Sequence, residues 1–151
     1  MNDVEFSVEG VDTPAWLERA RRFALSVLER LGKERWDLSV LICDDGFIQG
    51  LNRQYRDRDE PTDVLSFEQG ESYKAPDGSD RWLAGDVIIS LGGLARNAAD
   101  FGVSEDNELK RLIVHGILHL SGHDHSDNDP GQAMLRLQEE LLAGLASERI
   151  V

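Results

Sequence analysis

All four histidines of this 151-residue chain lie between His115 and His125. His115 and His119 are four residues apart, so on a helix they project from one face with their Cβ atoms about 5–6 Å apart. Gly122 can end that helix and let the chain reverse, which allows His125 to return to the same point. The spacing therefore predicts a helix around which the rest of the chain folds. With the turn that follows, it brings three imidazoles to one metal ion.

Three neutral imidazoles with an open fourth position are typical of a catalytic zinc site, whereas structural zinc sites usually have four protein ligands. We therefore expect one Zn²⁺ per chain, held by His115, His119 and His125. The fourth histidine, His123, follows the predicted end of the helix. We expect it to lie beside the ligands together with Asp124, a carboxylate that can orient a ligating imidazole.

The same histidine spacing is used by metzincin peptidases, in which the residue after the first histidine is a glutamate that acts as the general base. In this chain that residue is Gly116. Loss of the carboxylate argues against hydrolysis of peptide bonds. Phosphodiester cleavage instead requires charge stabilisation on the phosphoryl oxygens and an activated nucleophile, which a cation and an arginine can supply.

A local cluster of arginines stands out in an acidic chain. The net charge is −13, which disfavours nonspecific binding of nucleic acid, and no DNA partner is expected. The distribution of charge matters more than its sum, and Arg53, Arg56 and Arg58 gather at the end of a predicted helix. The planar guanidinium suits phosphate. Pairing with neighbouring acidic residues explains Arg53 and Arg58 equally well.

The one cysteine, Cys43, excludes an intrachain disulfide and fits a reducing compartment. We expect it to be a small core residue with a raised thiol pKa, because Asp44 and Asp45 follow it directly. The N-terminus does not resemble an export signal, and no apolar stretch is long enough to span a bilayer. We therefore expect a cytoplasmic protein without a membrane partner.

Apolar periodicity predicts alternating strands and helices within one domain over residues 1–151. The helices are expected to begin at caps Asp12 or Thr13, Asp44 and Ser104, and after Gly92. A polar loop is expected over 68–81. The predicted strands are 4–8, 36–43, 63–67 and 85–91. The predicted helices are 14–31, 45–56, 93–99, 105–121 and a last one with its apolar stripe over 134–145.

Several of these segments resemble one known family. The segments are His115-Gly116-x-Leu118-His119-x-x-Gly122-x-Asp124-His125, Asn52-x-x-Tyr55-Arg56, Thr62-Asp63-Val64-Leu65-Ser66-Phe67 and Gly85-Asp86. In this order they are similar to the YbeY family of bacterial endoribonucleases and ribosomal-RNA maturation factors. One departure is Glu68, where the family usually has proline.

The resemblance implies an α+β fold with a single mixed sheet of about four strands, about five helices, and a metal-site helix like that of the zincins. It also implies zinc on His115, His119 and His125, and a role for Arg56 in RNA binding or catalysis. We therefore expect Arg56 and His115 to act in catalysis, and Arg53 to join Arg56 in binding substrate.

The leading hypothesis is a zinc-dependent, single-strand-selective endoribonuclease acting in rRNA maturation and ribosome quality control. Its expected partners are rRNA and ribosomal proteins or the small ribosomal subunit. A second hypothesis is a ribosome-assembly factor with a structural metal that binds without cutting, since an acidic surface attracts basic ribosomal proteins. A metallopeptidase is the weakest of the three.

Asp63 and Asp86 are candidates for hydrogen bonds that support the fold or the site.

Overall fold

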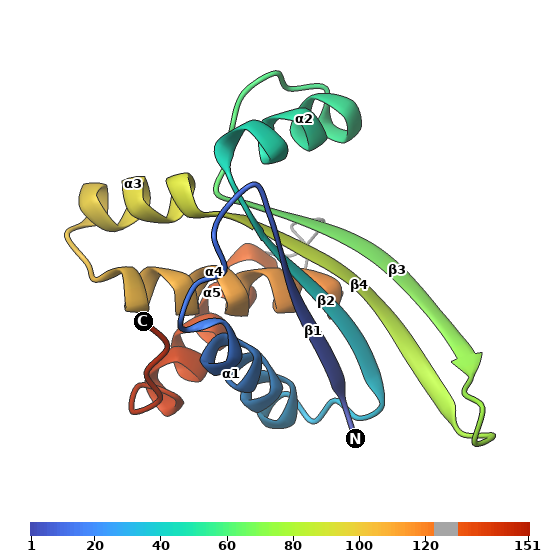
Figure 1. Ribbon diagram of the computed structural model, residues 1–151. Coiled ribbons are helices and arrows are strands. Elements are labelled where there is room, and N and C mark those ends of the chain that lie inside the picture. Colours follow the sequence, from blue (N-terminus) through green and yellow to red (C-terminus); the bar gives the residue numbers. More distant parts are fainter. Residues whose placement is uncertain (123–129) are drawn as a thin grey trace.

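Four strands form one mixed sheet in the order β1-β2-β4-β3 (Figure 1). The computed structural model describes residues 1–122 and 130–151. The first three strands in this order are mutually parallel, and β3 is an edge strand that runs antiparallel to β4. The bounds are β1 Asp3–Glu9, β2 Trp36–Cys43, β3 Val64–Lys74 and β4 Asp80–Ser90. The predicted mixed sheet of an α+β fold is confirmed.

Helices cover both faces of this sheet. They are α1 Leu17–Arg30, α2 Asp45–Arg56, α3 Leu91–Phe101, α4 Glu105–Leu120 and α5 Pro130–Gly144. The main core cluster joins one face of the sheet to α1, α4 and α5, while a smaller cluster around Cys43, Ile48, Leu65 and Ile88 joins the other face to α2. Because side chains alternate along a strand, β2 and β4 supply apolar residues to both clusters. The sheet thus separates α2 from α4 (Figure 1).

The loop expected over 68–81 is wrong, because this segment forms most of a long β-hairpin. β3 continues to Lys74 through an irregular register between Glu68 and Glu71, and β4 begins at Asp80. A short turn joins them, in which the Gly78 N–H donates to the Ala75 carbonyl. The hairpin extends away from the helices (Figure 1), and most of residues 68–80 are polar and exposed. Hydrogen bonds between the two strands form the hairpin, and the polar composition of the segment does not predict this strand pairing.

The predicted caps are partly confirmed. Asp44 accepts a hydrogen bond from the Phe47 N–H at 2.8 Å, and Ser104 caps α4 in the same way. The cap expected at Asp12 or Thr13 is wrong, since α1 begins at Leu17 after a turn in which the Leu17 N–H donates to the carbonyl of residue 14. With Ser90 capping α3, the helices α2, α3 and α4 each begin at a side-chain cap.

The C-terminus is fastened to the start of α4. Asp106 accepts hydrogen bonds from the backbone N–H groups of Ile150 at 2.6 Å and Val151 at 2.9 Å, and lies 3.1 Å from the Lys110 ammonium. Burial raises the pKa of Asp106, but these donors lower the pKa by more than burial raises it. The pKa of Asp106 therefore lies below its ordinary value. The carboxylate thereby stabilises the N-terminal end of the helix that carries the histidines.

None of the helices in residues 1–122 and 130–151 combines the length and the hydrophobicity that a membrane-spanning segment needs.

Candidate metal and phosphate site

A close contact between α4 and the sheet sets the position of the histidines. A Cβ atom added to Gly116 would lie 2.6 Å from Val87 Cγ1 and 2.9 Å from Cγ2, so glycine is required for this approach. His115, one residue earlier, lines a pocket at the edge of the sheet. Gly116 thus faces the sheet, where a peptidase glutamate has no room. The missing carboxylate follows from packing as well as from the chemistry of the site.

The two described histidines face each other as the spacing predicts. His115 Nε2 and His119 Nε2 are 3.0 Å apart, and the rings meet edge to face with centroids 4.5 Å apart. Two nitrogens bound at 2.0–2.1 Å to one tetrahedral ion would be about 3.3 Å apart. A shift of a few tenths of an ångström would therefore let both imidazoles hold a single zinc ion.

The orientation of His115 is set from α5. Its Nδ1 lies 3.2 Å from the side-chain oxygen of Gln138, which is only 3% exposed. An amide oxygen can only accept, so this contact favours the tautomer with the proton on Nδ1, which leaves the lone pair of Nε2 directed toward His119. This is the arrangement by which a buried partner fixes the tautomer of a metal-binding imidazole.

Arg56 reaches the same pocket from the opposite face of the sheet. The pocket has a volume of about 210 Å³, and Arg56, His115 and His119 line it together with residues 64–66 of the edge strand. Arg56 ends α2, and one of its terminal nitrogens donates to the Ser66 carbonyl at 2.9 Å. Because β3 is an edge strand, a side chain from α2 can pass around it. The structure thereby joins two predicted site residues that the sheet would otherwise keep apart.

The other arginines do not share this place. Arg53 lies on the last turn of α2, exposed, and is not among the described residues that line the pocket. Arg58 lies 3.8 Å from Glu60, and both side chains are largely exposed. Such a pair is typical of a solvated surface. Of the three clustered arginines, the geometry singles out Arg56.

The two candidate aspartates have different surroundings. Asp63 accepts hydrogen bonds from the Val64 N–H and the Asn97 amide, both at 2.7 Å, which tie the start of β3 to α3. Asp86 precedes Val87 on β4, so it points to the face covered by α2 and away from α4. Burial raises its pKa. Asp63 therefore serves the fold, and Asp86 lies on the face opposite the histidine helix.

The remaining predicted residues, His123, Asp124 and His125, lie outside the described residues. Within residues 1–122 and 130–151, no group of three or more histidine, cysteine, aspartate or glutamate side chains could hold a metal ion. The described part of the site consists of the His115–His119 pair, its support from Gln138, and Arg56.

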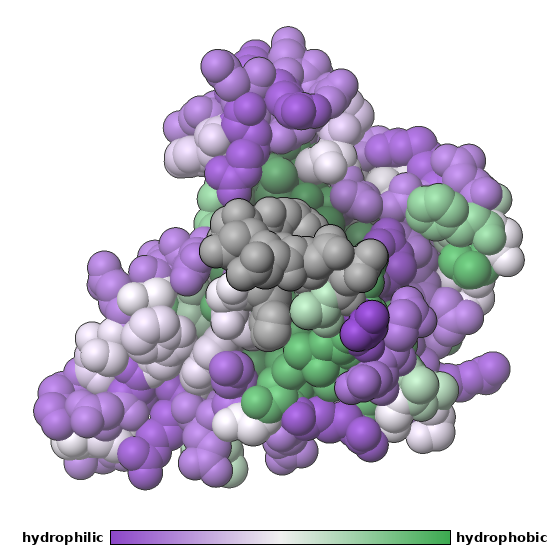
Figure 2. All heavy atoms as spheres, turned by 180° about the vertical axis from the view of Figure 1, so that it is seen from behind, coloured by the Kyte–Doolittle hydropathy of each residue, from purple (hydrophilic) through white to green (hydrophobic). Residues whose placement is uncertain are grey.

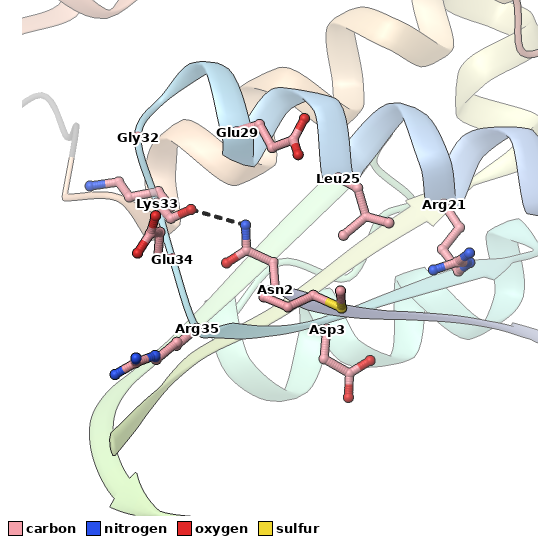
Figure 3. A pocket seen from close by; sticks show the side chains of 10 residues that line it. Asn2, Asp3, Arg21, Leu25, Glu29, Gly32, Lys33, Glu34 and Arg35 are labelled. Atoms are coloured by element: carbon pink, nitrogen blue, oxygen red, sulfur yellow. Dashed lines mark hydrogen bonds between the residues drawn. The ribbon is translucent and has the colours of Figure 1, made fainter. Parts of the chain in front are cut away.

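A second cavity lies at the other end of the sheet. It has a volume of about 720 Å³ and is lined by residues 1–3, by side chains of α1 and by the segment 32–35 that leads from α1 to β2 (Figure 3). Asn2 spans part of it by donating to the Lys33 carbonyl at 3.0 Å. Its charged residues are of both signs, among them Asp3, Glu29 and Arg35. None of the predicted site residues lines it, so it is separate from the histidine site.

Comparison with known proteins decides the family. The family model described as endoribonuclease YbeY matches residues 3–146. The chain belongs to the YbeY family. A Treponema denticola protein named endoribonuclease YbeY is 60% identical over 124 residues, covering 82% of this chain and 80% of the relative. One of the same name from Treponema pallidum strain Nichols is 49% identical over 143 residues, covering 95% and 89%. The chain is accordingly an enzyme of the metal-dependent endoribonuclease class.

The fold is shared more widely than the sequence. The solution structure of a Thermotoga maritima protein superposes with a TM-score of 0.60 at 24% identity, covering 97% of this chain and 93% of that one. The α+β fold predicted from the YbeY resemblance is therefore also found in a solved structure. The departure at Glu68 does not interrupt β3, which continues through this position into the hairpin.

One functional candidate in this YbeY-family chain was not predicted. Gln138 supports His115, yet it belongs to a helix assigned only to the core. A signal was present, because position 138 falls on the same helical stripe as Met134, Leu141 and Leu145, all of which are buried. A polar residue on an apolar stripe indicates a buried hydrogen-bond partner.

Proposed function

We propose that this chain is a zinc-dependent endoribonuclease, selective for single-stranded RNA, that acts in rRNA maturation and ribosome quality control. One observation supports this most directly: two imidazole nitrogens suited to one metal ion share a pocket with an arginine. In this proposal His115, His119 and His125 hold one zinc ion, with Asp124 and His123 beside them. RNA and the small ribosomal subunit are the partners.

A zinc ion held here would polarise a phosphoryl oxygen and favour deprotonation of a water molecule. Arg56 would bind the phosphate at the same time, because its guanidinium presents several donors in a fixed plane. The Ser66 carbonyl accepts from one of its terminal nitrogens and thus fixes the direction of the fork. Gln138 holds the proton of His115 on Nδ1, away from the ion. Arg53 lies one turn before Arg56 and would contact the RNA backbone further along.

The pocket geometry favours phosphate over peptide chemistry. A peptide amide leaves only with delivery of a proton, which the peptidase glutamate provides. Gly116 has no space for that side chain against Val87. An arginine on the reacting phosphate supplies the charge stabilisation that phosphodiester cleavage requires.

Metal content and cleavage are best measured on one set of variants. His115→Ala, His119→Ala and His125→Ala should each lose zinc and the cleavage of single-stranded rRNA fragments, whereas His123→Ala should keep the zinc. Retention of zinc by His125→Ala with loss in His123→Ala would show that the third ligand is wrong. Equal cleavage by wild type and His115→Ala would point to a contaminating nuclease and remove the basis of the proposal.

The two arginines near the end of α2 offer a matched pair. Arg56→Ala should lower the cleavage rate by about 100-fold, as loss of a charged donor on a reacting oxygen does. Arg58→Ala, whose side chain pairs with Glu60 in solvent, should be close to wild type. Equal effects of both changes would mean that the cluster acts only through its general charge. Zinc-loaded wild type that binds rRNA without cutting it would favour the assembly-factor hypothesis.

A further inference from the structure

An exposed aromatic pair stands beside the candidate site. Tyr55, in the last turn of α2, meets Phe67 of β3 edge to face, with ring centroids 5.3 Å apart and an interplanar angle of 70°. Phe67 is half-buried and packs against the smaller core cluster under α2. Tyr55 is 54% exposed. The pair is therefore anchored in the core at one ring and open to solvent at the other.

Arg56 connects this pair to the histidine pocket. Its guanidinium carbon lies 4.9 Å from the ring centroid of Phe67, a cation–π contact, while the same group donates to the Ser66 carbonyl. Arg56 also lines the pocket that contains His115 and His119. One guanidinium thus borders the aromatic pair on one side and the imidazoles on the other.

The end of α2 that carries Tyr55 is held by a buried side chain. Asn52 is 4% exposed, and its amide donates to the Glu60 carbonyl at 2.9 Å. Asp57, directly after the helix, has a left-handed conformation with φ at 61°, and its N–H donates to the Asn52 carbonyl. The segment after the helix is thereby tied back to it. A ring on such a support loses little conformational entropy when a ligand stacks on it.

The surroundings of the pair fit a nucleotide. Seen from behind in Figure 2, the top of the molecule, which α2 and the segment after it form in Figure 1, is mostly hydrophilic. An apolar peptide segment would find few further contacts there. A nucleotide unit combines a flat base with a charged phosphate, and here an aromatic ring lies next to an arginine. Aromatic rings and guanidinium planes are the groups on which proteins stack splayed-out RNA bases.

We propose that Tyr55 and Phe67 form a base-stacking subsite, which receives an unpaired base of the RNA strand next to the phosphate bound by Arg56. This inference rests on the proposed function. It gives that function a physical source of strand selectivity, since a base within a duplex is already stacked on both faces and cannot present one to a tyrosine. The subsite tolerates any base sequence, because every base has a stacking face.

Binding of a short, fluorescently labelled single-stranded oligoribonucleotide tests the subsite. The zinc-loaded wild type is compared with Tyr55→Ala, Tyr55→Phe and Tyr73→Ala by fluorescence anisotropy in the cold, and gels confirm that the RNA stays intact. Tyr73 is the matched control. Like Tyr55 it is an exposed tyrosine, with 41% of its surface exposed, but it lies on β3 at the far end of the hairpin. A second oligoribonucleotide of equal length carries abasic sugars and so keeps its phosphates without its bases.

Tyr55→Ala should raise the Kd for the normal strand by about 5- to 100-fold, the range for loss of one stacked base. Tyr55→Phe and Tyr73→Ala should stay near wild type, and the abasic strand should be bound equally by wild type and Tyr55→Ala. An unchanged Kd in Tyr55→Ala, or an equal loss of affinity for the abasic strand, would overturn the subsite. If the wild type still cleaves RNA in that case, the proposed function stands. A wild type that neither binds nor cleaves RNA would overturn both.

Discussion

Replacement of Gly116 by alanine tests whether the approach of α4 to the sheet is as close as the structure has it. The new Cβ would lie 2.6 Å from Val87 Cγ1, well inside van der Waals contact. Val87 is 1% exposed, and its β-branched side chain is stiff, so it cannot easily turn away. Either the helix or the strand has to move, and His115 and His119 would move with the helix.

Two terms of opposite sign decide the magnitude. Overpacking of this kind costs about 1–3 kcal/mol. Alanine in place of glycine inside a helix gains about 1 kcal/mol. We therefore expect Gly116→Ala to lower the free energy of unfolding by about 1 kcal/mol, with strain outweighing propensity. In a Val87→Ala background both clashing methyl groups are gone, so the same change should become stabilising.

Urea unfolding followed by tryptophan fluorescence can measure the full double-mutant cycle, since the chain has three tryptophans. The coupling free energy should equal the strain, about 1–3 kcal/mol. Gly50→Ala in α2 is the control, because a Cβ there meets nothing within 4 Å. It should stabilise by up to about 1 kcal/mol. Gly116→Ala at least as stable as wild type, or no coupling to Val87, would refute the reasoning.

Three further predictions follow from individual contacts. The Asp106 carboxylate has a pKa below its ordinary value of 3.8, so its stabilisation is present above that pH and is lost as the pH falls through the folded pKa. Asp106→Asn should lower the free energy of unfolding by about 1–2 kcal/mol at neutral pH, and unfolding curves of the two proteins should converge in acid. Burial, with Asp44 and Asp45 adding to it, raises the pKa of the Cys43 thiol to about 12. Iodoacetamide should therefore leave the folded protein unmodified in mildly alkaline buffer and alkylate it in urea, and rapid alkylation of the folded form would contradict this burial. Gln138→Leu should weaken zinc binding by about 10- to 100-fold in a chelator competition, while Gln138→Glu, which keeps an acceptor, should bind more tightly than the leucine variant. Equal zinc affinity in wild type and Gln138→Leu would mean that the amide does not orient His115.

The sequence by itself determined what depends on contacts within one element. The four-residue spacing places His115 and His119 together on α4, where their Nε2 atoms are 3.0 Å apart. Asp44 and Ser104 cap their helices because a cap bonds to backbone three residues away. Cys43 is buried as its apolar strand predicts, and the neighbouring acids contribute to its raised pKa. Such features can be predicted from the sequence because both partners lie within one turn or one strand.

Only the tertiary structure decided which distant residues meet. Arg56 reaches the histidines from the opposite face of the sheet because β3 lies at the edge, and no local pattern specifies which strand that is. Gln138 meets His115 because α5 packs on α4. From the sequence, Gly116 was notable only because a peptidase has its catalytic glutamate at this position. The fold shows in addition that Val87 leaves no space for a side chain there. The polar segment 68–81 forms a hairpin because its hydrogen bonds run between strands. In each case the deciding energy comes from packing or pairing across the chain, which periodicity within one segment does not encode.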